Sequence, residues 1–185
     1  MNRAPKRVLV VDGYNVINAR GRVAGAEALA EARDDLLLRL QDYAGYSGQH
    51  IVLVFDAWMS DRTARTVERN APVDVVFTQK GETADHYIER FCDEHAADVE
   101  YRRIELRVAT SDLLEQTIIM GRGASRISSR ELLMEMEQVR KGGAAKAAQT
   151  VSKRSRVEDR IPPETLAKLR EMAREPEKEK KRRKK

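Results

Sequence analysis

Residues 7–12 read Arg-Val-Leu-Val-Val-Asp, an unbroken apolar run that ends in an acid. A run that is apolar on both faces predicts a buried strand of a parallel sheet and not a half-exposed strand. The same pattern returns in residues 51–55, which Asp56 follows, in residues 104–109, and in a shorter form in residues 73–77. The sequence therefore predicts four buried strands of a mainly parallel sheet.

Helical patterns lie between these predicted strands. Apolar residues recur at helical spacing in residues 25–45 and 83–97, and residues 112–120 predict a short helix. Ser128 and Glu131 form a capping-box sequence, in which the two side chains satisfy free N–H groups where a helix begins. We expect that helix to run to about residue 140. Strands that alternate with helices predict an α/β fold in which helices cover a parallel sheet.

Charge is distributed unevenly along the 185 residues, which carry a net charge of +5. Residues 177–185 hold seven Lys and Arg against two Glu, residues 140–160 hold seven bases against two acids, and residues 1–139 are net acidic. We predict a folded domain over residues 1–141, with a basic linker, a short helix at 161–174 and a disordered Lys/Arg tail over residues 142–185. Such a basic extension favours a polyanionic partner.

Composition also limits the setting in which this chain works. The single cysteine, Cys92, excludes an internal disulfide framework, which is typical of a reducing compartment. No run approaches the roughly 18–20 apolar residues of a membrane span, and the basic N-terminus leads into a strand pattern and not into the apolar core of a signal peptide. We expect a cytoplasmic protein without a membrane partner.

Acidic residues follow the predicted strands in a regular way. Asp12 and Asp56 end two strands, Asp112 follows a third, and Glu82 and Asp85 stand where a helix begins. The carboxyl ends of parallel strands meet at one edge of the sheet, where α/β folds place their sites. Crowded carboxylates repel one another, and Mg²⁺ or Mn²⁺ is the common remedy. The pattern therefore predicts a divalent-metal site that acts on phosphate esters.

Simpler explanations exist for each of these residues. Asp and Glu also favour the first turn of a helix for capping and dipole reasons. His86 stands beside Asp85, but a surface histidine explains it as well, and the three histidines lack zinc-ligand spacing with Cys92. A phosphohydrolase of the haloacid-dehalogenase type needs a second acid after Asp12, where this chain has Gly13-Tyr14.

Residues 11–17, Val-Asp-Gly-Tyr-Asn-Val-Ile, resemble the opening motif of NYN domains, which belong to the PIN-like nuclease superfamily. Together with residues 54–57, 78–89, 108–112 and 121–133, the phrases are similar in order to YacP-type NYN proteins, over about residues 6–141. That resemblance implies a PIN-like three-layer α/β/α sandwich with a mainly parallel central sheet. It also implies a site in which Asp12, Asp85 and Asp112 bind metal, with Asn15 beside the first of them and with Glu82 and Asp56 at matching positions.

Two functions stay open on these grounds. The resemblance implies a Mg²⁺- or Mn²⁺-dependent endoribonuclease that cleaves single-stranded RNA. The chain is similar to a bacterial and plastid enzyme that cuts mRNA only in the presence of the ribosome, so the ribosome is an expected partner. The alternative is a non-catalytic RNA- or ribosome-binding module, which would share the basic tail but has no need of clustered acids. Arginines of the body, near residues 62–69 or 122–130, are a second place to look for an RNA path.

Overall fold

The computed structural model describes residues 4–56, 63–111 and 123–142. Six strands form one sheet: β1 (Lys6–Asp12), β2 (His50–Phe55), β3 (Thr66–Asn70), β4 (Val73–Phe77), β5 (Ile104–Ala109) and β6 (Ser125–Ile127). Their order across the sheet is β3-β4-β2-β1-β5-β6, and all neighbours are parallel except β3 and β4. The sheet is therefore mixed but mostly parallel, with β1 near its centre.

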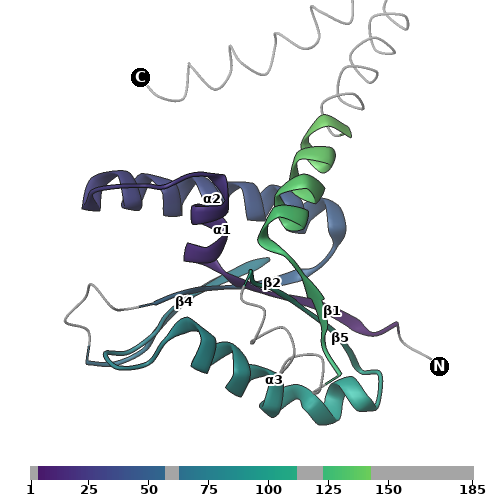
Figure 1. Ribbon diagram of the computed structural model, residues 1–185. Coiled ribbons are helices and arrows are strands. Elements are labelled where there is room, and N and C mark those ends of the chain that lie inside the picture. Colours follow the sequence, from purple (N-terminus) through teal and green to yellow (C-terminus); the bar gives the residue numbers. More distant parts are fainter. Residues whose placement is uncertain (1–3, 57–62, 112–122, 143–185) are drawn as a thin grey trace, which may run out of the picture. The chain divides into compact units, whose positions relative to one another are not determined.

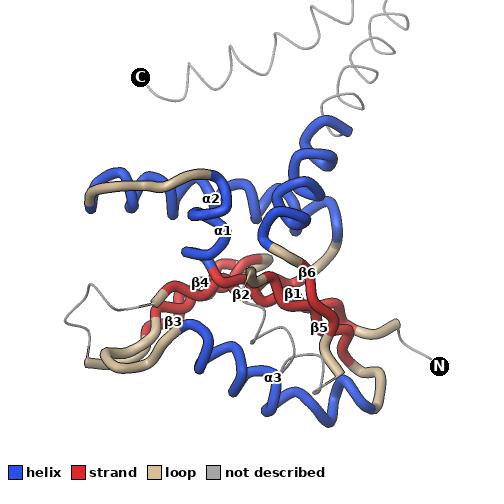
Figure 2. Tube along the Cα trace, in the orientation of Figure 1, coloured by secondary structure: helices blue, strands red, loops and turns tan. Residues whose placement is uncertain are grey.

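Helices cover both faces of this sheet (Figures 1 and 2). One face carries α1 (Gly13–Arg20), α2 (Ala26–Ser47) and the helix of residues 129–142, and the other carries α3 (Ala84–Glu100). Side chains that alternate along the strands divide between two cores. Leu9, Val11 and Leu53 face one core, and Val8, Val10 and Val54 face the other. This is the predicted three-layer α/β/α sandwich.

The four predicted buried strands are confirmed, each within one residue of its predicted start. The two long helices are confirmed as α2 and α3. The capping box is also confirmed, because the Ser128 N–H donates to the Glu131 carboxylate at 2.7 Å and the Glu131 N–H donates to Ser128 Oγ at 3.2 Å. The helices predicted at 112–120 and 161–174 lie outside the described residues.

A polar network ties the helix of residues 129–142 to the rest of the domain. The Tyr43 hydroxyl donates to Glu135 at 2.6 Å, and Arg107 of β5 donates to the same carboxylate at 3.0 Å. Gln49 donates to the Tyr43 oxygen at 3.3 Å. These bonds link α2, β5 and the last described helix, so that helix is anchored by polar contacts as well as by its apolar residues Leu132 and Met136.

Two further properties bear on organisation. The contacts divide the chain into two compact units, Met1–Arg140 and Lys141–Lys185, and the site described below lies in the first. Among the described residues, the helices are too short or too polar to cross a membrane.

Candidate functional site

The strand register brings the predicted strand-end residues to one edge of the sheet. Asp12 pairs with Val54, Phe55 pairs with Phe77, and Val11 pairs with Ala109. The residues that complete or follow these strands therefore line up across the carboxyl edge as Thr78, Asp56, Asp12 and Thr110. The side chains of Thr78 and Thr110 are fully buried. This edge is the candidate functional site.

Asp12 is the most constrained residue of the edge. Its side chain is 5% exposed and caps α1, where it accepts the Asn15 backbone N–H at 3.0 Å and the Asn15 side-chain amide at 2.8 Å. Burial raises the pKa of Asp12, the bonds from Asn15 oppose this rise, and the nearby Asp56 carboxylate adds to it. The net direction is upward, so this carboxylate is held in place while its charge is poorly solvated.

Position 13 is a glycine because the Phe55 ring leaves no room there for a side chain. A Cβ built on Gly13 would lie 2.2 Å from Cε1 of Phe55 and 2.6 Å from its Cδ1. The Phe55 ring also packs 5.1 Å from the Tyr14 ring and 5.7 Å from the Phe77 ring, between centroids. The start of α1 thus rests directly on the residue that precedes Asp56, which fixes the backbone of the two carboxylates relative to each other.

The other predicted acids take different positions. Asp56 is half-buried beside Asp12, and Asp85 is half-buried in the first turn of α3. That helix begins at the same edge and is capped by Thr83, whose hydroxyl accepts the backbone N–H of the exposed His86 at 3.2 Å. Asp112 lies outside the described residues. Within residues 4–56, 63–111 and 123–142, no three acidic, histidine or cysteine side chains come close enough to hold a metal ion.

Glu82 is engaged by two arginines. Its side chain is 8% exposed and accepts Arg65 Nη2 at 2.7 Å and Nε at 3.2 Å, and Arg90 Nη2 at 2.6 Å. Burial alone would raise the pKa of Glu82, but the bonds from the two guanidinium groups outweigh it and hold the pKa below its ordinary value. A role for Glu82 as a metal ligand would have to compete with these two ion pairs.

The pairing of Arg65 and Arg90 with Glu82 was not predicted from the sequence. Arg65 belongs to one of the arginine groups noted as a second RNA path, but its pairing with Glu82 spans 17 residues and two elements. The i to i+8 spacing of Glu82 and Arg90 is not a helical pairing signal either, since Glu82 precedes the helix. Only the fold brings the three together.

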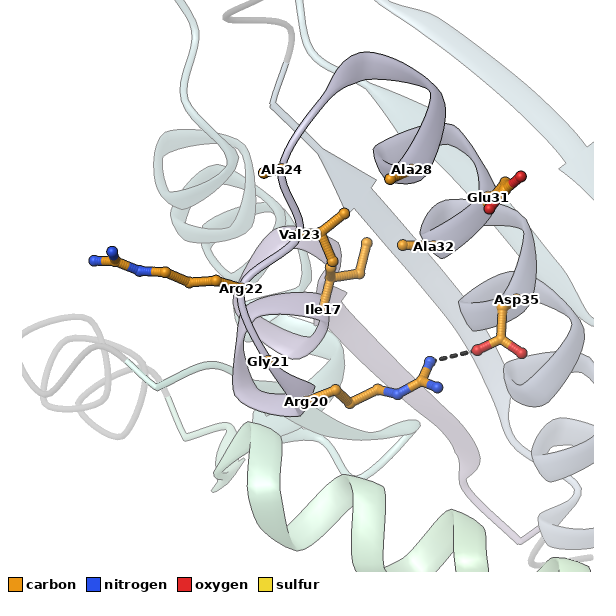
Figure 3. Close-up of a pocket in the computed structure, with 10 residues that line it drawn as sticks. All are labelled: Ile17, Arg20, Gly21, Arg22, Val23, Ala24, Ala28, Glu31, Ala32 and Asp35. Atoms are coloured by element: carbon orange, nitrogen blue, oxygen red, sulfur yellow. Dashed lines mark hydrogen bonds and ion pairs between the residues drawn. The ribbon is translucent and has the colours of Figure 1, made fainter.

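A hollow of about 590 Å³ lies elsewhere, between the end of α1, the following loop and α2 (Figure 3). An ion pair joins Arg20 and Asp35 across it, and Ile17, Val23 and Ala32 supply apolar lining. The predicted acids do not line it. The strand-end edge, and not this hollow, therefore holds the residues whose chemistry the sequence predicted.

Comparison with known proteins shows which family the sequence matches. A family described as the YacP-like NYN domain matches residues 9–174, so the match extends beyond residue 141, the predicted end of the folded domain. The protein named uncharacterized protein YacP, from Bacillus subtilis strain 168, is 39% identical over 134 residues, which are 71% of this chain and 76% of that protein.

Solved structures give the same picture. A crystal structure of Rae1 (YacP) from Bacillus subtilis has a TM-score of 0.65 and 33% identity, and the match covers 90% of this chain and 94% of that one. The crystal structure of a single-substitution mutant of the same protein has a TM-score of 0.65 and 35% identity, covering 83% and 89% of the two chains.

Proposed function

Because the chain belongs to the YacP-like NYN domain family, we propose that it is a metal-dependent endoribonuclease that cleaves single-stranded RNA. Membership supports a nuclease-type role that concerns RNA. The observation that carries the proposal is the buried Asp12 at the end of the central strand, clamped by Asn15 and coupled to Asp56. The proposed setting is the cytoplasm, on mRNA and in association with the ribosome.

The donor set at the edge fits a hard divalent cation. Mg²⁺ is often bound through one or two carboxylates, with water and substrate phosphate as the remaining ligands. Asp12 and Asp56 form such a pair, and a cation between them would relieve the unfavourable burial of charge that raises the pKa of Asp12. We propose Mg²⁺ or Mn²⁺ held by these two residues, with Asp112 as a further ligand. Asp85 does not form a group of three with them among the described residues, so its proposed place in the ligand set requires the first turn of α3 to move toward the edge. When bound, such an ion neutralises charge on the scissile phosphate.

Residues of the chain have separable tasks in this proposal. Asn15 donates to both oxygens of the Asp12 carboxylate, through its backbone and through its side chain, and so fixes their direction. Gly13 and Phe55 hold the Asp12 and Asp56 backbones together. Cleavage by an attacking water would leave a 5′-phosphate and a 3′-hydroxyl, and it makes no use of the ribose 2′-hydroxyl.

The test combines cleavage with a binding readout. Purified protein is incubated with labelled RNA in Mg²⁺, Mn²⁺ or EDTA, alone and in a translating extract. Asp12→Asn should reduce cleavage on the order of 10²-fold or more. Asp34→Asn, on the exposed side of α2, should cleave like the wild type. Metal should raise the melting temperature of the wild type and of Asp34→Asn but not of Asp12→Asn.

One observation keeps a second function in view. The acids among the described residues do not form a group of three that could hold a metal ion. A binding module without catalysis would not need such a group. Metal-independent RNA or ribosome binding without cleavage in either setting would establish that alternative. Cleavage by Asp12→Asn at the wild-type rate in EDTA would refute the nuclease proposal at this edge.

A further inference from the structure

Arg65 and Arg90 converge on one buried carboxylate at the rim of the candidate site. Both donate to Glu82, and both guanidinium groups lie over the Tyr87 ring, at 5.1 and 5.4 Å from its centroid. Arg90 also pairs with Glu94 at 3.7 Å. We name Arg65, Glu82, Tyr87 and Arg90 the arginine clamp.

The strand register places the clamp beside the acids. Thr66 of β3 pairs with Phe77 of β4, and the two strands are antiparallel, so Arg65 stands at the carboxyl edge beside Thr78. Since neighbouring strands are about 4.8 Å apart, the Arg65 backbone lies roughly 10 Å from that of Asp56 along this edge. Glu82 stands at the turn that leads into α3, where its backbone N–H donates to the Gln79 carbonyl. An extended polymeric ligand that crosses the carboxyl edge of the sheet can therefore reach the arginine clamp.

Charge in the clamp exceeds what a structural ion pair needs. One carboxylate would be matched by one guanidinium, but Glu82 holds two, and the further carboxylate at Arg90, that of Glu94, is 61% exposed and lies 3.7 Å away. The positive charge of the two guanidinium groups is therefore only loosely matched on the solvent side, on a body that is net acidic over residues 1–139. The arginine side chains remain 32% and 42% exposed, whereas Glu82 is 8% exposed. Arg65 uses Nε and Nη2 on Glu82, and each guanidinium carries five donors in total. Donors thus remain for a ligand on the solvent side.

Preorganisation makes this arrangement suited to phosphate. An arginine whose guanidinium plane is already fixed by a carboxylate and an aromatic ring loses little side-chain entropy when it binds. Planar guanidinium forks match the oxygens of phosphate.

We propose that the arginine clamp binds a backbone phosphate of single-stranded RNA next to the acid edge, with Glu82 as the residue that positions Arg65 and Arg90. This inference rests on the proposed function, because it takes RNA as the substrate. It assigns Glu82 to holding the substrate-binding arginines and not to holding the metal.

The chain offers a matched control at the opposite edge of the sheet. Arg103 pairs with Asp98 at 3.2 Å and lies 5.4 Å from the Tyr101 ring centroid, directly before the amino end of β5. It therefore has the same kinds of partner as the clamp arginines but lies away from the acids. Arg103→Gln removes the same charge as Arg65→Gln or Arg90→Gln.

Binding of a short labelled single-stranded RNA to the full-length variants is measured by anisotropy between about 50 and 200 mM salt, in EDTA. We expect Arg65→Gln and Arg90→Gln each to weaken binding several-fold, and to reduce the slope of log affinity against log salt by about 0.7 for the lost phosphate contact. Arg103→Gln should bind like the wild type. Thermal unfolding shows whether each variant is folded.

Different outcomes would refute the clamp and the proposed function. If the wild type binds RNA and both clamp variants match Arg103→Gln in affinity and salt slope, the clamp is structural and the inference fails, while the nuclease proposal stands. If the wild type neither binds nor cleaves RNA, the proposed function itself fails. A Glu82→Gln variant that is folded should also bind RNA more weakly, although it is more positive; tighter binding would refute the positioning role.

Discussion

Gly13→Ala is the substitution for which the structure gives the sharpest expectation. The new methyl carbon would meet the Phe55 ring at 2.2 Å, whereas carbon atoms in contact are ordinarily about 3.5–4.0 Å apart. The overlap is therefore at least about 1.3 Å, so either the ring or the first turn of α1 must move. Three ring atoms of Phe55 lie within 3.0 Å of the built position, so a small rotation of the ring does not relieve the overlap.

Two opposing terms set the magnitude. Overpacking of a filled core typically costs about 1–3 kcal/mol, while replacing Gly by Ala in a helix gains up to about 1 kcal/mol. We expect a net loss of about 1–2 kcal/mol in the free energy of unfolding. For a chain of this size, each kcal/mol lowers the melting temperature by about 2–4 °C. Urea unfolding followed by circular dichroism measures the loss.

Gly45→Ala provides the control, because Gly45 lies within α2 and no atom beyond its chain neighbours and the backbone of its own helix stands within 4 Å of the position its Cβ would take. That variant should be more stable than the wild type, by up to about 1 kcal/mol. Phe55→Leu should partly rescue Gly13→Ala, giving a coupling energy within the usual range of about 0.5–3 kcal/mol for contacting residues. If Gly13→Ala were as stable as Gly45→Ala, the close approach would be refuted as the reason for the glycine.

Three further predictions concern other parts of the chain. Glu82→Gln should be less stable than the wild type at neutral pH, and the two stabilities should converge as the pH falls below about 4.5. The pKa of Glu82 is lowered in the fold, so the stabilisation from its carboxylate is lost as that group takes up a proton. A stability difference that stays constant from about pH 7 to about pH 3 would contradict this. Tyr43→Phe should cost about 1 kcal/mol in urea unfolding, through the lost bond to Glu135, and an unchanged midpoint would show that the network adds nothing. Deleting residues 177–185, which follow the part matched by the family, should lower RNA affinity and its salt dependence without changing the melting temperature; equal salt slopes would leave the tail without a role in binding.

Strands buried on both faces could be predicted from sequence because their apolar runs are continuous. The edge strand β3 could not be predicted, since its residues Thr66–Asn70 are mostly exposed and include charged side chains, a pattern that is equally typical of a loop. The helix α1 escapes prediction for another reason: it is only eight residues long and begins at a glycine directly after a strand, so Gly13-Tyr14-Asn15 is equally typical of a turn. The three-residue β6 is too short to leave a pattern.

The candidate site divides along the same line. The position of Asp12 at the end of a strand, with Asn15 beside it, could be predicted because it depends on local sequence alone. The ion pairs of Glu82 could not be predicted, because its partners are Arg65, directly before β3, and Arg90 in α3. A carboxylate before a helix is equally typical of a metal ligand and of an ion pair. The spacing of residues along the chain does not indicate which arginine pairs with which acid when the partners lie far apart in sequence.

The central place of β1 has a consequence for how the domain opens. Because β1 is hydrogen-bonded to β2 on one side and β5 on the other, its amides should exchange with solvent only in the rarest openings, whereas β3 is bonded to a single neighbour and should exchange much sooner. Asp12 sits at the end of a strand that is bonded on both sides, and Arg65 stands directly before an edge strand. As temperature or denaturant rises, the contact of Arg65 with Glu82 should therefore loosen while Asp12 is still held in place, so that the proposed phosphate contact is lost before the proposed metal site.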